Sequence, residues 1–216
     1  MTLRAVVLGG AGMLGKVLTP TLTDAGWEVV AYDIADADIT QPEEIHALLA
    51  SSRPEVVVHA AAMTDVDGCE RDPDRAYAVN ALGTRNVAAA CRDLDAALLY
   101  VSTDFVFNGA KREPYQEDDA IAPLCTYGRS KAWGEEFVRE LTTRHWVVRT
   151  QWLFGPGGNN FVDTMRRLFR ERDEVKVVAD QVGSPTATRD LAAAIGRILE
   201  AGGHGTYHAA CRGETS

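Results

Sequence analysis

Short apolar runs alternate along the chain with longer segments in which apolar residues recur at every third or fourth position. The short runs are typical of buried β-strands, and the longer spacing predicts amphipathic helices. Because the strands are apolar throughout and are separated by helices, we predict an α/β fold with a doubly wound parallel sheet covered on both faces. The predicted strands span residues 4–8, 28–32, 55–59, 97–102, 146–150, 175–178 and 206–209.

Two irregular stretches interrupt this alternation. Residues 108–124 are rich in charge, Pro and Gly, and residues 151–161 carry the turn signals of WLFGPGGNNF. Long irregular loops are more often functional than accidental, so we predict that these two line a substrate pocket. We assign residues 1–150 to a dinucleotide-binding domain. Residues 151–216 then supply substrate-pocket elements and the last strands of the sheet.

Composition narrows the possible partners. The chain has 216 residues, 46% of them hydrophobic and 25% charged, with a net charge of −9. That charge disfavours nucleic acid and anionic membranes as partners. The cysteines and histidines show no disulfide or metal-ligand spacing, and no run approaches the ~20 apolar residues of a membrane helix. We expect a cytoplasmic protein with reduced thiols.

The segment GGAGMLG directly follows the first predicted strand and precedes a helix. It fits GxGxxG when read from Gly10 and GxxGxxG when read from Gly9. Such loops bring the backbone close to a pyrophosphate at a helix N-terminus, which makes this a Rossmann-type cofactor loop. A plain glycine-rich turn is the alternative. The residues expected at the cofactor are Gly9, Gly12, Met13, Leu14 and Gly15.

Asp33 ends the second predicted strand, about 20 residues beyond the glycines, where the dinucleotide fingerprint requires an acid. A carboxylate there accepts hydrogen bonds from the adenosine ribose diol and repels a 2′-phosphate. No Arg or Lys follows before Arg53. We therefore expect NADH to be preferred, with NADPH possible. The alternative is a turn-forming Asp at a strand end.

Tyr127 and Lys131 are four positions apart in CTYGRSK, so a helix points both side chains the same way. A nearby ammonium favours the phenolate, which would lower the pKa of the tyrosine and make it a proton donor and acceptor near neutrality. The fourth strand ends at Ser102-Thr103-Asp104, which places Thr103 at the crevice where ligands bind such sheets. A solvated surface pair is the alternative interpretation of Tyr127 and Lys131.

From the first strand to the last residue, the sequence resembles the dTDP-4-dehydrorhamnose reductase family of the extended short-chain dehydrogenase/reductases. The blocks that carry the resemblance are GGAGMLG, AAMTDVDGCE, AYAVNALGTRN, STDFVFNG, YGRSK, RTQWLFGPGGNNFV and ADQVGSPT. The resemblance implies that Thr103 hydrogen-bonds the substrate carbonyl and Tyr127 donates the proton. Lys131 would hold the nicotinamide ribose and lower the pKa of Tyr127.

Further positions take roles from the same resemblance. Asn80 would lie near the active site, with a locally satisfied helix residue equally plausible, and an aromatic such as Trp152 at a strand end can also belong to the core. The implied cofactor contacts are Asp38, Ile39, Ala60, Ala61 and Ala62, together with Tyr127 and Lys131. The implied substrate contacts are Thr64, Val66, Thr103, Asp104, Phe105 and Trp152.

Several positions depart from the family pattern. Met63 stands where Tyr is usual and Gln151 where Ser is common, so the sugar is less certain than the reaction. Arg189 replaces the Glu that holds magnesium in some members, and we expect no metal. The family continues beyond the equivalent of Ser216, so we expect an incomplete C-terminal substrate-binding portion.

The resemblance implies NADH-dependent reduction of dTDP-4-dehydro-L-rhamnose, a nucleotide-sugar substrate, by an enzyme that is a homodimer in many relatives. A reductase for another 4-keto-6-deoxyhexose is one alternative. A non-catalytic dinucleotide-binding subunit, like the regulatory partner of methionine adenosyltransferase, is another. A dehydratase is disfavoured because Phe105, and not Glu, follows Thr103-Asp104.

Overall fold

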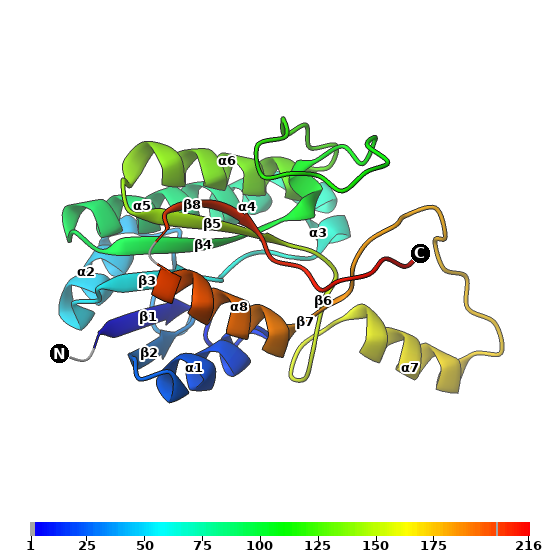
Figure 1. The fold of residues 1–216 in the computed structure, drawn as a ribbon, viewed down its shortest axis with the longest axis horizontal. Coiled ribbons are helices and arrows are strands. Elements are labelled where there is room, and N and C mark those ends of the chain that lie inside the picture. Colours follow the sequence, from blue (N-terminus) through cyan, green and yellow to red (C-terminus); the bar gives the residue numbers. More distant parts are fainter. Residues whose placement is uncertain (1–2, 202) are drawn as a thin grey trace.

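A parallel sheet forms the centre of the molecule in the computed structural model, which describes residues 3–201 and 203–216 (Figure 1). Its strand order is β2-β1-β3-β4-β5-β8, and every neighbouring pair is parallel. The predicted doubly wound α/β fold is therefore confirmed. The strands are β1 (Arg4–Leu8), β2 (Glu28–Tyr32), β3 (Val56–His59), β4 (Ala97–Thr103), β5 (His145–Thr150) and β8 (Gly205–His208).

Helices cover both faces of the sheet, and each face has its own apolar core. On one face lie α2 (Pro42–Ser52), α5 (Thr84–Asp93) and α6 (Thr126–Leu141); on the other lie α1 (Gly15–Asp24) and α8 (Thr188–Ala201). Successive residues of a strand point to opposite faces. Val57 of β3 accordingly belongs to the first core, and Val56 and Val58 belong to the second.

One predicted strand is wrong. Residues 175–178 form no strand, and Val177 and Val178 are 49% and 62% exposed. β-branched residues favour an extended backbone but make a strand only where a neighbouring edge can pair with them. Two short strands that the sequence did not predict, β6 (Leu153–Phe154) and β7 (Thr186–Ala187), pair with each other in a separate small sheet.

Short helical elements connect the carboxyl ends of the strands to the longer helices. These are α3 (Val66–Arg71), α4 (Pro73–Tyr77), the π-helix η1 (Ala78–Gly83) and the 3₁₀ helix η2 (Asp104–Val106). A π-turn is rare and is found mostly near functional sites. The π-helix runs directly into α5, so its wider turn changes which residues of that continuous helix face α6.

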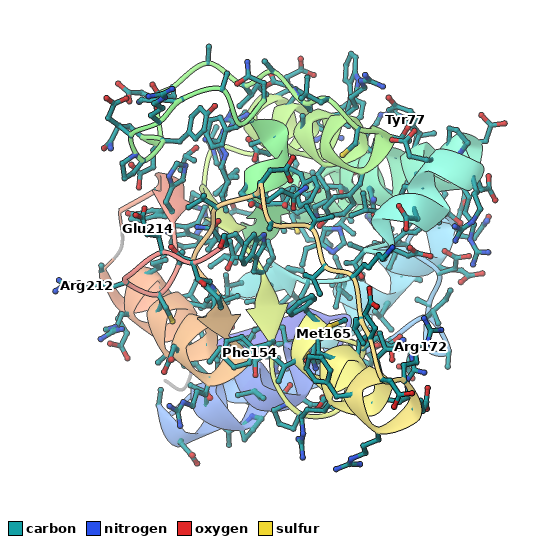
Figure 2. All side chains as sticks on the ribbon, turned by 90° about the vertical axis from the view of Figure 1, so that its right-hand side faces the viewer. Tyr77, Phe154, Met165, Arg172, Arg212 and Glu214 are labelled. Carbon is teal, nitrogen blue, oxygen red and sulfur yellow. The ribbon has the colours of Figure 1, made fainter. Side chains whose placement is uncertain are left out.

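Both irregular stretches lie at the carboxyl edge of the sheet, on the right of Figure 1. There α7 (Phe161–Glu171) stands beside the sheet, and none of its residues is buried. Figure 2 looks onto this edge, with α7 in front. No helix among the described residues is long and apolar enough to cross a membrane.

Candidate active site

The glycine loop joins β1 to α1 at the carboxyl edge of the sheet. Gly9 has φ of +89°, which a side chain rarely adopts, and a Cβ there would lie 2.7 Å from the backbone nitrogen of Ala61. A Cβ at Gly15 would collide with the backbone of Gly9 and Gly10. The loop therefore packs against the end of β3 and against the first turn of α1 with no room for side chains.

The loop also offers donors to a ligand. Within residues 3–201 and 203–216, no acceptor faces the backbone amides of Met13 and Leu14 at the start of α1. Free amides and the helix dipole together favour a phosphate. The side chain of Leu14 is buried in the core below, whereas Met13 is partly exposed and contacts the loop at Gly158. These residues fit a dinucleotide pyrophosphate.

Asp33 directly follows β2 and lies beside the glycine loop. Its Oδ2 accepts a hydrogen bond of 2.8 Å from the amide of Ala11, and its Oδ1 accepts one from the amide of Ile34. The carboxylate is therefore fixed at the loop. Arg53 lies at the far end of α2 and lines a hollow with Pro54 and Glu55, near the start of β3.

The remaining predicted cofactor contacts divide into two groups. Ala60, Ala61 and Ala62 continue from β3 and are partly exposed at the carboxyl edge. Ile39 instead belongs to the core, where a Cβ at Gly83 would lie 2.8 Å from its Cγ1. Asp38 caps its own turn, because its Oδ1 accepts from the amide of Thr40.

Thr103 is the last residue of β4, and it is buried. Its Oγ1 accepts a hydrogen bond from the amide of Phe105 at 3.1 Å and donates one of 2.9 Å to Asp104 Oδ1. Burial raises the pKa of Asp104 to about 6, although the Thr103 hydrogen bond acts in the opposite direction. These two bonds fix the rotamer of the hydroxyl at the carboxyl edge.

Tyr127 lies in the first turn of α6, with its ring edge-on to Phe105 at 5.6 Å. A Cβ at Gly128 would collide with the carbonyl of Phe105, so only glycine lets α6 approach η2 this closely. Burial raises the pKa of Tyr127 well above its ordinary value, while a hydrogen bond with Thr103 acts to lower it. The direction of this pKa shift is opposite to the lowering expected from Lys131, because burial dominates it.

Lys131 is 2% exposed and points back into the protein. Its Nζ donates a hydrogen bond of 2.7 Å to the carbonyl of Val101 and lies 4.0 Å from the centre of the Tyr100 ring. Burial lowers the pKa of Lys131 to about 7, and the charge of Glu135 acts to raise it. The ammonium is therefore held at the end of β4, one turn below Tyr127.

Asn80 in the π-helix is buried, and both its side-chain oxygen and its side-chain nitrogen are hydrogen-bonded. Its side chain accepts from the amide of Met63 at 2.8 Å and donates to the Met63 carbonyl and to Ser130 Oγ. Asn80 thereby ties the loop after Ala62 to α6. Of the two residues expected to approach the sugar from that loop, Thr64 is exposed and Val66 is partly exposed at the start of α3.

The predicted substrate wall also contains a strained residue. Trp152 has φ of +44°, uncommon for any residue other than glycine, and its indole packs against Gly183. Such strain persists where surrounding contacts enforce it, and it clusters at ligand sites. Phe105 and Trp152 are both partly exposed at the carboxyl edge.

An ion pair that the sequence did not predict lies behind the site. Glu135 is completely buried, and Arg149 reaches it with two hydrogen bonds, Nε to Oε1 at 2.9 Å and Nη2 to Oε2 at 2.8 Å. The signal was present, since an arginine inside the apolar strand WVVRT needs a partner. No cluster of three or more metal-ligating side chains occurs in the described part of the chain, and Arg189 is exposed beside Asp190.

Because the glycine loop and the group of Thr103, Tyr127 and Lys131 share one edge of a doubly wound sheet, the chain is a Rossmann-type protein of the extended short-chain dehydrogenase/reductase class. The family model described as "RmlD substrate binding domain" matches residues 3–216, and the chain belongs to that family.

Named relatives agree with this assignment. The chain is 46% identical over 99% of its length to the dTDP-4-dehydrorhamnose reductase of Streptomyces griseus, covering 72% of that protein. It is 41% identical over 100% of its length to the dTDP-4-keto-6-deoxy-D-glucose reductase of Streptomyces niveus, covering 75%. The crystal structure of dTDP-4-dehydrorhamnose reductase from Bacillus anthracis in complex with NADP superposes with a TM-score of 0.96 at 43% identity, over 100% of this chain and 77% of that one.

Proposed function

We propose that the protein is a nucleotide-sugar 4-keto reductase that reduces dTDP-4-dehydro-L-rhamnose to dTDP-L-rhamnose with NADH. The observation that carries this proposal is the convergence of Thr103, Tyr127 and Lys131 beside a loop with free phosphate-binding amides. The family and the names of the relatives support the substrate.

The chain's own groups divide the chemistry between them. A raised pKa keeps the Tyr127 phenol protonated at neutral pH, which is the form needed to donate a proton to a developing alkoxide. On substrate binding, the Thr103 hydroxyl would donate its one hydrogen bond to the carbonyl that receives this proton, in place of Asp104 Oδ1, and so orient it. Lys131, held below Tyr127, supplies positive charge to the same region. The nicotinamide, when bound, supplies the hydride.

We further propose that NADH is preferred over NADPH. Asp33 is fixed at the glycine loop, where its negative charge repels a 2′-phosphate. No Arg or Lys stands between Asp33 and Arg53, and Arg53 lies near the opposite end of the strands. The relative from Bacillus anthracis was crystallised with NADP, so the proposal concerns preference and not exclusion.

A reductase acting on a different 4-keto-6-deoxyhexose is the second candidate. It is favoured by the 41% identical relative from Streptomyces niveus and by Met63 and Gln151, which depart from the family pattern near the substrate. The reaction is the same in both candidates, so the choice concerns only the sugar. The chain spans about two thirds to three quarters of the length of its curated relatives.

Turnover decides between an enzyme and a binding protein. NADH oxidation is followed with dTDP-4-dehydro-L-rhamnose and with the 4-keto-6-deoxy-D-glucose nucleotide as separate substrates. Tyr127→Phe should lower kcat by about 10²-fold or more. Tyr207→Phe removes a hydroxyl from the outer strand β8, where it donates to the carbonyl of Gly203, and should leave kcat unchanged. Tight NADH binding with no turnover on either sugar would contradict the proposal.

The cofactor preference has its own test. Asp33→Asn keeps the size of the side chain but removes the charge, so the ratio of kcat/KM for NADH over NADPH should fall by about tenfold. Asp36→Asn, an exposed neighbour in the same turn, is the control and should change the ratio far less. Equal ratios in the wild type and Asp33→Asn would contradict the preference.

We also propose that the protein is a homodimer through the outer face of η1 and α6, where Leu82 and Trp133 are 48% and 55% exposed. Light scattering should give twice the chain mass for the wild type and the monomer mass for Trp133→Glu. A monomeric wild type would rule out this part of the proposal.

A further inference from the structure

Glu135 is the most enclosed charged group in the described part of the chain, with no exposed surface. Four hydrogen bonds satisfy its two oxygens. Oε1 accepts from Ser102 Oγ at 2.6 Å and Arg149 Nε at 2.9 Å, and Oε2 accepts from Arg149 Nη2 at 2.8 Å and Arg139 Nη2 at 2.7 Å. A buried carboxylate that binds this many donors is fixed in place.

These bonds join three elements that carry the proposed chemistry. Glu135 belongs to α6, Ser102 lies on β4 next to Thr103, and Arg149 lies opposite Ser102 on β5. The Arg149 guanidinium continues outward to the carbonyl of Glu117 in the 108–124 loop. The carboxylate therefore fastens α6 to the carboxyl ends of β4 and β5, and Arg149 extends this attachment to the 108–124 loop.

Glu135 also lies four residues after Lys131, so both side chains point from the same side of α6. The Lys131 ammonium donates to Val101 at the same end of β4. A buried ammonium and a buried carboxylate on the same side of one helix attract each other strongly because little water screens them.

We propose that Glu135 is a positioning residue for the reductase chemistry: its buried carboxylate keeps Lys131 in the charged form and locks the helix carrying Tyr127 and Lys131 against Thr103. The proposal deepens the proposed function and rests on it. Glu135 acts through Lys131 and through the β4 end, and no contact with substrate is required of it.

The surroundings of Lys131 and Glu135 shift the pKa of each group, and these shifts support the proposed role. Burial opposes the charge on Lys131 and brings its pKa to about 7, and Glu135 is the group that acts to raise it. Burial acts to raise the pKa of Glu135 itself, but the hydrogen bonds and charge of Arg149 outweigh it, so that pKa is lowered and Glu135 stays ionised at neutral pH. Without this charge, Lys131 would lose its proton at lower pH.

Other groups near Lys131 do not replace Glu135. His59 on β3 is buried, and burial first and then Lys131 lower its pKa to about 3, so it is neutral. Tyr100 on β4 presents its ring face and has a raised pKa through burial, so it is neutral too. Further titratable groups on α6 and on the elements packed against it include Cys69 and Glu70 on α3, Asp104 on η2, Tyr127 on α6 and Arg149 on β5.

The decisive experiment follows the titration of Lys131 directly. The chain has four lysines, Lys16, Lys111, Lys131 and Lys176, so NMR of ¹³Cε-labelled lysine is readily assigned with Lys131→Arg. In Glu135→Gln, Lys131 should titrate at lower pH than in the wild type, by about half a pH unit or more. Arg139→Gln removes another ligand of the same carboxylate but leaves its charge, and should cause no downward shift. This measurement needs neither substrate nor cofactor, so it stands even if the proposed substrate is wrong.

A second arm measures the chemistry. The pH at which kcat/KM falls on the basic side should move downward in Glu135→Gln with the Lys131 titration. The value of kcat should fall by about tenfold, because small displacements of reacting groups are costly. Glu135→Asp restores the charge and should recover the pH profile. A purely structural role would lower activity in both variants and leave the basic limb in place, which would overturn the proposal.

If Glu135→Gln does not fold, a double variant can be measured in its place. The double variant Glu135→Gln/Arg149→Met removes both partners, and replacing a buried pair together is far better tolerated than leaving one charge alone. It is measured by the same NMR titration. Wild-type titration of Lys131 in either folded variant overturns the inference, and a downward shift supports it.

Discussion

Two regions at the same edge of the sheet are built in opposite ways. Around α6, β4 and β5, the charged side chains of Lys131, Glu135 and Arg149 are all less than 5% exposed and all hydrogen-bonded. Residues 155–185, which include α7, contain exposed charges and exposed apolar side chains, among them Phe161 at 62% and Phe169 at 68%. Buried, hydrogen-bonded charges hold the first region together. The second region, residues 155–185, is held by contacts at its two ends.

Those end contacts can be named. At one end, Lys16 Nζ donates to the carbonyl of Gly157 at 2.9 Å, and Asn160 reaches Met13. At the other end, Gly183 forms an antiparallel bridge with Thr215. The groups proposed for proton transfer therefore depend on the sheet itself, whereas the proposed substrate wall depends on its attachment to the cofactor loop and the C-terminal segment seen in Figure 2.

The largest effect should come from the buried ion pair. Arg149→Met leaves Glu135 buried without its main partner and should lower the free energy of unfolding by about 3–5 kcal/mol. Arg167→Met removes an exposed pair with Glu171 on α7 and should cost less than about 0.5 kcal/mol. Urea unfolding of both variants measures the difference. Similar losses would mean that the two regions are not built differently.

Lys131→Met should stabilise the fold at pH 6, by an amount on the order of 3 kcal/mol. The folded-state pKa is about 7 and lies below the unfolded value, so the unfolded chain binds the extra proton between the two. The free energy of unfolding of the wild type therefore rises with pH above about 7. The advantage of Met should shrink as pH climbs toward 10, which thermal melts at several pH values check. An advantage that grows with pH would contradict this.

Lys16→Met should have a smaller effect on stability, about 1 kcal/mol or less, because it removes a single hydrogen bond from an exposed lysine. The loop around Gly157 would lose its attachment beside the glycine loop, so KM for the cofactor should rise severalfold while kcat changes little. Steady-state kinetics with NADH varied give both constants. A fall in kcat with unchanged KM would show that the attachment serves the chemical step instead.

Phe169→Ser should change the free energy of unfolding by less than about 0.5 kcal/mol, since its ring is mostly in solvent in this chain. Leu191→Ala, buried on α8, is the contrasting variant and should cost about 2–5 kcal/mol. A large loss in Phe169→Ser would show that the apolar face of α7 is covered in solution.

The parts of the fold that could be predicted from the sequence are those that short stretches determine by themselves. Apolar strands and the glycine loop are local signals, so the sheet, the position of Asp33 and the placing of Tyr127 on a helix all followed from short stretches. The paired strands β6 and β7 did not, because two residues carry too little pattern to show which edge they meet. Residues 175–178 were wrongly predicted as a strand because a β-branched run does not show whether a neighbouring strand is there to pair with it.

The pKa of Tyr127 and the orientation of Lys131 could not be predicted from the spacing of these two residues alone. Four-residue spacing correctly put Tyr127 and Lys131 on one side of α6, but it could not show that Lys131 turns to Val101 or that burial controls the phenol. The sequence left open whether Asn80 lies near the active site or is a locally satisfied helix residue. In the structure its side chain forms hydrogen bonds with Met63 and Ser130. Such outcomes depend on residues distant in sequence, which no local pattern contains.

The strand order has a consequence for synthesis on the ribosome. Five strands of the sheet are complete at Thr150, but α8, which covers Leu18 and Leu22 of α1, begins only at Thr188. At ~5–20 residues per second, this apolar face stays uncovered for about 2–8 seconds while the roughly 40 intervening residues are added. A nascent chain in that interval presents a chaperone with an uncovered apolar helix face on a sheet that still lacks β8.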